Sequence, residues 1–160
     1  MLNAIPKTWF FWNFSLQEVD GTPVADLSIS SWRGEGSVSL RDGSRYLVCN
    51  RRFSPLVLEA ADGLEIAHAN GLGFFRNGFA VTHGERRYTL KPVRWIGREH
   101  GVFAEGRELG RVCPAMLFSR RAQAKIADEV PLVLQAFLVW LTLREWKRDW
   151  DAGTMSTGGT

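Results

Sequence analysis

Apolar and polar residues alternate over several short runs in the first 126 positions of the chain. A period of two is typical of β-strands with one face buried, and the apolar residues involved are mainly aromatic or β-branched. The pattern therefore predicts a largely β protein made of short strands. The alternating apolar positions are Phe10, Trp12, Phe14 and Leu16; Val38 and Leu40; Tyr46 and Val48; Phe79 and Val81; Tyr88 and Leu90.

A repeated turn signal separates these runs. An acidic residue and a glycine begin three similar stretches, Asp20–Asp26, Asp62–His68 and Glu105–Arg111, whose glycines lie 42 and 43 residues apart. A second pair of turns, at Gly43 and Gly84, is 41 residues apart. Glycine accepts the positive φ of tight hairpin turns, so a unit of about 42 residues holds two hairpins, or four strands. Three such units predict about twelve strands, the last near residues 124–127.

The number of strands favours one closed or rolled barrel. Closure removes the unpaired edge strands that an open sheet must protect. A repeat of this length is also typical of propeller blades, but three blades are too few, and no Gly-His or Trp-Asp pair sits at the blade positions.

One helix is predicted at about residues 130–149, beginning near Pro131. Its apolar residues cover every face, so we expect it to be buried inside the curled sheet, with only Gln135 and Thr142 needing polar partners. The apolar stretch, at thirteen residues, is shorter than the roughly 20 that cross a bilayer, so no transmembrane span is expected. It also lacks the broad polar face of a membrane-surface helix. We expect a single domain over 1–151 and a disordered tail over 152–160.

Composition and charge agree with one globular domain. Of the 160 residues, 45% are apolar and 23% charged, and the net charge is +3 with a pI of about 9.2. The first residues lack the features of a signal peptide, which predicts a cytoplasmic protein. Cys49 and Cys113 are expected to be buried free thiols rather than a disulfide.

The repeated Asp/Glu-Gly-x-x-aliphatic-Ala/Gly phrase and the ending Pro131-Leu-Val-Leu-Gln-Ala-Phe-Leu-Val-Trp-Leu141 resemble the tubby C-terminal-like superfamily, which includes LURP-one-related proteins and phospholipid scramblases. The resemblance extends from about Phe10 to Trp150. It implies a twelve-stranded barrel around a central helix and contact with membrane lipids, since tubby proteins bind phosphoinositide headgroups. No tubby headgroup residue matches by position, and the acidic Ca²⁺ segment of scramblases has no counterpart. The chain is most similar to a small bacterial-type member.

Basic residues gather between positions 76 and 98, with Glu85 as the acidic exception. If Tyr88 and Leu90 point inward, then Arg87 and Lys91 point outward. Such a surface would attract the phosphates of an anionic lipid or another phosphorylated ligand. The alternative is a solvated barrel exterior with acidic neighbours, and a second basic stretch at 107–125 has the same two interpretations. The candidate ligand-binding residues are Arg76, Arg86, Arg87, Lys91, Arg94 and Arg98.

Aromatic residues form a cluster at Trp9–Trp12, which we expect to fill the barrel core. The alternatives are insertion at a membrane interface and base stacking, but the aromatics do not interleave with the arginines as nucleic-acid binding requires. His68, His83 and His100 have no metal-ligand spacing with the cysteines, and no nucleophile motif is present. We therefore expect no catalytic residues, no metal and no cofactor.

These observations favour a non-catalytic binding module, for anionic phospholipid headgroups at a membrane surface. The alternative is a cytoplasmic structural or partner-binding domain without lipid contact. A third hypothesis, an enzyme, requires a deep pocket with convergent polar groups at the barrel mouth.

Overall fold

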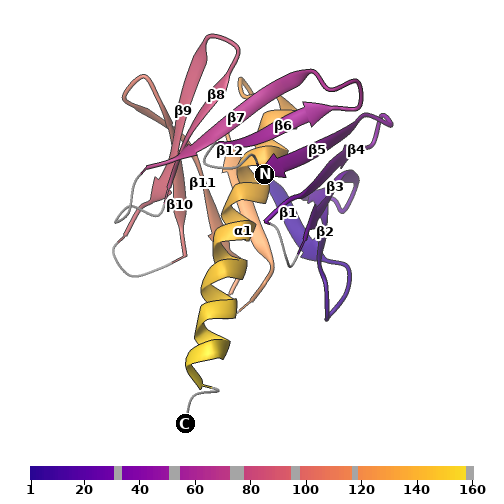
Figure 1. The fold of residues 1–160 in the computed structure, drawn as a ribbon, viewed down its shortest axis with the longest axis vertical. Helices are drawn as coiled ribbons and strands as arrows, with labels where there is room; N and C mark the ends of the chain where they lie inside the picture. Colours follow the sequence, from indigo (N-terminus) through magenta and orange to yellow (C-terminus); the bar gives the residue numbers. More distant parts are fainter. Residues whose placement is uncertain (31–33, 51–54, 73–77, 95–97, 117–118, 158–160) are drawn as a thin grey trace.

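The computed structural model describes residues 1–30, 34–50, 55–72, 78–94, 98–116 and 119–157. Twelve antiparallel strands form a closed barrel in which each strand pairs with its neighbours in sequence, and β1 pairs with β12 (Figure 1). The prediction of a twelve-stranded barrel around one helix is confirmed. The strands are β1 Leu2–Pro6, β2 Trp12–Glu18, β3 Pro23–Ile29, β4 Gly36–Leu40, β5 Arg45–Asn50, β6 Leu56–Ala60, β7 Glu65–Gly71, β8 Phe79–His83, β9 Arg86–Pro92, β10 His100–Ala104, β11 Arg107–Pro114 and β12 Ala122–Ile126.

The predicted hairpin turns all lie at one end of the barrel, which we call the turn end. Gly21, Gly43, Gly63, Gly84 and Gly106 have φ values between +60° and +94°. A side chain would be strained in that conformation, which is why glycine occupies these positions. In three of the turns an aspartate side chain accepts a hydrogen bond from a backbone N–H two residues on, at 2.8–3.0 Å. These acidic residues therefore fix turn geometry.

The single helix, α1 Leu132–Thr157, begins at the turn end and passes through the barrel (Figure 1). The Pro131 carbonyl accepts hydrogen bonds from the N–H groups of Leu134 and Gln135 at 3.0 and 2.9 Å, which closes the first turn. The helix then leaves the opposite end, which we call the exit end, and projects beyond the strands (Figure 1). It continues past residue 149, where the sequence predicts its end, so that residues 152–157 are helical instead of belonging to a disordered tail. No helix in the described ranges is long and apolar enough to cross a membrane.

The barrel interior is filled by the apolar helix, as predicted. Every residue from Ala136 to Leu143 is fully buried. The two polar side chains that the sequence expects to need partners find them locally. Gln135, just before this stretch, donates to the Val130 carbonyl at 2.8 Å, and Thr142 donates to the Leu138 carbonyl at 3.0 Å. The buried helix therefore carries its own polar groups into the core without leaving them unpaired.

One hydrogen bond connects the middle of the helix to the barrel wall. The Trp140 indole N–H donates to the Ser28 carbonyl of β3 at 2.8 Å. Gly36 of β4 makes room for this contact, because a Cβ atom there would lie 1.9 Å from the Ser28 oxygen and 2.9 Å from Trp140 Nε1. The helix is thereby held against β3 and β4 at a fixed depth.

Three expectations are corrected. Phe10 belongs to a connection rather than a strand, since β2 begins at Trp12, and β12 begins at Ala122 instead of Ala124. The two cysteines are free, but both are half-buried rather than buried, because the inward positions of their strands belong to the adjacent Val48 and Val112.

Candidate functional site

The predicted basic residues are spread along the whole length of β9 and the connection that follows. Arg86 lies at the turn end, where its guanidinium is 3.6 Å from a carboxylate oxygen of Glu129 and stacks over the Tyr88 ring. Tyr88 and Leu90 are buried, as the sequence predicts, so Arg87 and Lys91 are exposed on the outer wall. Arg76 lies outside the described residues.

Arg94 and Arg98 lie in the connection to β10, at the exit end. The two differ in environment: Arg94 is exposed, whereas Arg98 is half-buried and lies over the Trp146 ring at 4.2 Å. Arg98 donates to the Ser119 carbonyl at 3.1 Å, and its own carbonyl accepts from Trp146 Nε1 at 2.9 Å. Burial lowers the pKa of the Arg98 guanidinium, opposed by the charge of Asp149. Arg98 thus holds the helix against the barrel rim. The five candidate residues that the structure describes do not gather in one place.

Much of the second basic stretch is neutralised by acidic neighbours. Arg107 lies 2.5 Å from Glu129, and Arg111 pairs with both Glu99 and Glu108. Hydrogen bonds from Arg111 lower the pKa of the Glu108 carboxyl. On this part of the wall the structure favours the solvated exterior that the sequence left as an alternative.

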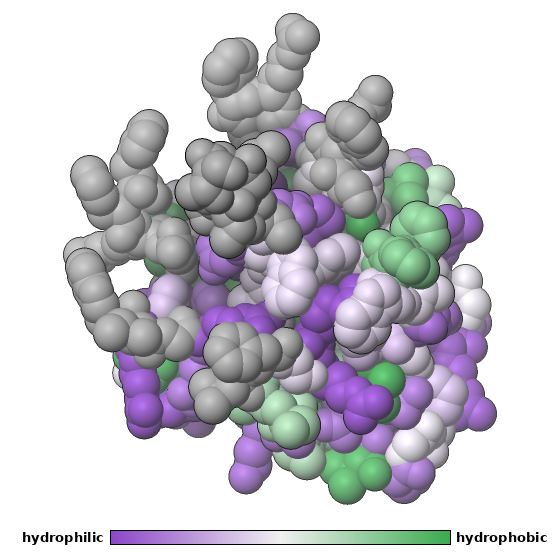
Figure 2. All heavy atoms as spheres, turned by 90° about the horizontal axis from the view of Figure 1, so that it is seen from below, coloured by the Kyte–Doolittle hydropathy of each residue, from purple (hydrophilic) through white to green (hydrophobic). Residues whose placement is uncertain are grey.

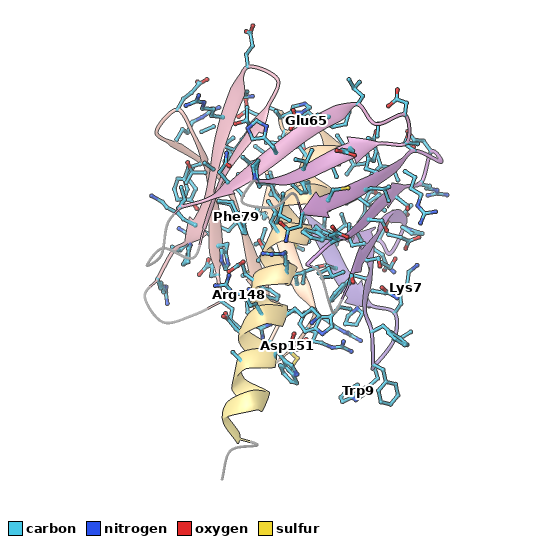
Figure 3. All side chains as sticks on the ribbon, in the orientation of Figure 1. Lys7, Trp9, Glu65, Phe79, Arg148 and Asp151 are labelled. Atoms are coloured by element: carbon cyan, nitrogen blue, oxygen red, sulfur yellow. The ribbon has the colours of Figure 1, made fainter. Side chains whose placement is uncertain are left out.

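Among the described residues, the most exposed aromatic side chains belong to the connection between β1 and β2, at the exit end. Trp9, Phe10 and Phe11 are 83%, 86% and 63% exposed. We call these three residues the aromatic tip. Figure 3 shows Trp9 beyond the strands, beside the projecting helix. The prediction that this cluster fills the core is wrong for the tip and right for Trp12, which is buried. Lys7 and Thr8 interrupt the alternation of apolar and polar residues before the tip. That interruption is the feature of the sequence from which a connection, rather than a strand, could have been predicted.

Arg120, from the β11–β12 connection, holds the aromatic tip in place. Its guanidinium donates to the Thr8 carbonyl at 2.8 Å and to the Phe11 carbonyl at 3.3 Å. It also lies 5.8 Å from the centre of the Trp9 ring and 5.6 Å from that of Trp12. These contacts span more than one hundred residues of sequence, so spacing alone could not predict them. They fix a connection that would otherwise be free to collapse onto the barrel.

A groove of about 870 Å³ lies between the aromatic tip, the β11–β12 connection and the helix. Of the described residues that line it, four have cationic side chains and one, Asp151, has a carboxylate. Figure 2, which views the exit end, shows hydrophilic and apolar side chains side by side on this face. The exit end therefore combines exposed aromatic surface with positive charge. The groove is lined by Pro6, Lys7, Thr8, Trp9, Phe10, Trp12, Ser119, Arg120, Arg121, Lys147, Trp150 and Asp151.

The cations of the groove differ in how far they are already paired. Lys7 lies 2.6 Å from Asp26, and the nearly buried Lys147 pairs with Asp151 one turn further along the helix. Arg121 is exposed, and among the described residues no carboxylate pairs with it. Arg120 also has no carboxylate partner in that part of the chain, but it donates to two backbone carbonyls. Arg121 is therefore the exposed groove cation whose donors are least engaged.

Two buried titratable groups lie near the point where the helix leaves the barrel. Burial raises the pKa of the Glu145 carboxyl, although Arg148 and Arg144 act in the opposite direction. Burial lowers the pKa of His100, whose Nδ1 lies 3.2 Å from the Arg98 carbonyl and whose Nε2 is buried without a partner in the described structure. Neither residue belongs to the lining of the groove.

Two further features concern metal binding and thiol chemistry. The described ranges contain no group of three or more His, Cys, Asp or Glu residues able to hold a metal ion. Cys113 lies on the outer wall, where burial raises the pKa of its thiol and its Sγ contacts the Gln123 carbonyl. Such a thiol is a weaker nucleophile at neutral pH than an ordinary cysteine.

Comparisons with known proteins identify no relative of this chain. No family model, curated protein or solved structure matches the chain.

Proposed function

We propose that the chain is a non-catalytic module that binds anionic phospholipid surfaces through its exit end. The observation that carries the proposal is the aromatic tip, held outward by Arg120 beside a groove with four cations and one carboxylate. Tryptophan and phenylalanine partition into the interfacial region of a bilayer, and each nearby Lys or Arg adds about 1 kcal/mol of attraction to an anionic surface.

The proposal moves the binding surface from the one expected in the sequence. The basic residues of β9 and of the connection after it remain a predicted site, but Arg86 and Arg98 are engaged within the protein. The exit end has both aromatic side chains that can insert into a bilayer and cationic side chains that attract anionic headgroups. The outer wall at Arg87 and Lys91 has only the cationic side chains. In this proposal the module works on the cytoplasmic side of the membrane, which the two free thiols support.

Membership of the tubby C-terminal-like superfamily is part of the same proposal. Its support is the fold, because a twelve-stranded barrel around a central helix is what that resemblance implies.

The test is flotation of the purified protein with vesicles of phosphatidylcholine alone or mixed with phosphatidylglycerol, at low and moderate salt. We expect salt-sensitive binding to the anionic vesicles only. The double variant F10S/F11S should bind at least about tenfold less, since each Phe presents on the order of 100 Å² of apolar surface, worth about 2.5 kcal/mol when fully buried.

Matched changes on the barrel wall provide the controls. Leu47→Ser alters an apolar residue that is 45% exposed on β5, and R87E/K91E reverses two exposed charges on β9. We expect the apolar control to bind as the wild type does. Loss of binding in R87E/K91E with retention in F10S/F11S would return the site to β9. Absence of binding to either vesicle would refute lipid binding and favour the partner-binding alternative.

A further inference from the structure

The groove at the exit end has the chemistry of a site for one small amphiphile. Its volume of about 870 Å³ lies within the range of ligand-binding pockets in proteins. Aromatic rings line it from two sides, with Trp9, Phe10 and Trp12 on the barrel and Trp150 on the helix. Such walls favour an apolar chain lying between the rings.

The charges of the groove select the polar end of the ligand. Lys7 and Lys147 already pair with carboxylates. Arg120 donates hydrogen bonds to the carbonyls of Thr8 and Phe11. Arg120 and Arg121 both lack a paired carboxylate in the described structure, so the groove carries excess positive charge. No side-chain hydrogen bond of Arg121 is formed among the described residues, so Arg121 is the arginine with donors available for an anionic group. A carboxylate matches the planar donor fork of arginine.

Lys147 supplies a second, more deeply placed donor. Its side chain is only 9% exposed, and its one hydrogen bond in the described structure goes to Asp151. An ammonium group has three donors, which leaves two for a ligand. The side chain of Asp151 is itself 55% exposed. An anionic group entering between Arg121 and Lys147 would meet donors on both sides.

We propose that this groove binds one long-chain monocarboxylate, with its chain against the aromatic rings and its carboxylate near Arg121 and Lys147. The inference rests on the proposed function, because the groove shares Trp9 and Phe10 with the surface that meets the membrane. It adds a binding site for a single lipid molecule to the contact with the membrane surface.

The experiment is a calorimetric titration of the full chain with decanoate below its micellar concentration. Acetate keeps the charge and removes the chain, and decyltrimethylammonium keeps the chain and inverts the charge. We expect one decanoate per protein and no saturable binding of either control. Equal binding of decyltrimethylammonium would overturn the proposal, because the groove would then bind any chain regardless of charge.

Arg121→Gln locates the site without disturbing the core, since Arg121 is exposed. Loss of a charge-assisted hydrogen bond predicts decanoate binding about tenfold to a hundredfold weaker. The matched control is Lys125→Gln, an exposed cation on β12 outside the groove, which should leave the affinity unchanged. Unchanged affinity in Arg121→Gln would overturn the assignment.

Flotation of the same preparations separates the two proposals. Vesicle binding without saturable decanoate binding overturns the groove ligand and leaves the membrane proposal standing. Decanoate binding that Arg121→Gln weakens, without flotation on vesicles, supports the ligand site and overturns the membrane contact.

Discussion

Replacing Trp140 by phenylalanine tests whether the hydrogen bond between the helix and β3 fixes the depth of the helix. The Trp140 side chain is fully buried and donates to the Ser28 carbonyl at 2.8 Å. Loss of that bond costs about 1 kcal/mol. The smaller ring also leaves a cavity of about 40 Å³, which at about 24 cal/mol per Å³ adds another ~1 kcal/mol. We therefore expect Trp140→Phe to lower the free energy of unfolding by about 2 kcal/mol.

The measurement is urea unfolding followed by far-ultraviolet circular dichroism. Thermal unfolding provides a second measurement. For a protein of this size, a loss of ~2 kcal/mol corresponds to a fall in Tm of about 4–8 °C. Trp150→Phe is the matched control, because Trp150 is on the same helix but 51% exposed, and it should shift the unfolding free energy by less than about 0.5 kcal/mol. If Trp140→Phe is as stable as the control, the hydrogen bond to Ser28 does not hold the helix.

Three further changes probe the core and its response to acid. Gly36→Ala should destabilise the fold by more than about 4 kcal/mol in urea unfolding, because its Cβ would lie 1.9 Å from a carbonyl oxygen. Gly153→Ala is the control, since a Cβ at that position meets no atom within 4 Å, and it should not destabilise the fold to this extent. Equal effects of the two changes would refute the steric argument. Phe137→Ala should cost about 3–5 kcal/mol in the same assay, and a cost below 1 kcal/mol would show that the core collapses around the gap. Burial lowers the pKa of His100, so its contribution to stability is present above its ordinary pKa of 6.5 and is lost as the pH falls through its lower folded value. Unfolding free energies measured between pH 7 and pH 4 should fall less in His100→Leu than in the wild type, and parallel profiles would exclude His100 as the source.

The fold was predictable because its determinants are local. Each turn glycine occupies its position for a reason contained in two or three residues, as at Asp42 and Gly43, where a side chain caps the turn and φ is +94°. The helix was predictable from its uniform apolar surface between Leu134 and Leu143. Burial on all sides follows from that composition alone.

The candidate site was less predictable because it depends on contacts between distant segments. The run from Arg86 to Arg98 is continuous in sequence, but β9 carries it from one end of the barrel to the other. Glu129, which neutralises Arg86, comes from the connection before the helix. Likewise, nothing near Phe10 in the sequence shows that Arg120 keeps the aromatic tip exposed. Residue types and spacing identify charge and aromaticity, but they do not identify the partners.

The helix that fills the barrel comes after all twelve strands in the chain, and this order constrains synthesis in the cell. Proteins emerge from the ribosome from the amino terminus at about 5–20 residues per second. For the whole period in which β1 to β12 emerge, the residues that complete their core are still missing. Inward apolar positions such as Phe14 and Leu58 therefore stay without their final neighbours until α1 has emerged. The nascent barrel is thus a natural client for chaperones, and ribosomes that stall before residue 131 would release chains unable to fold.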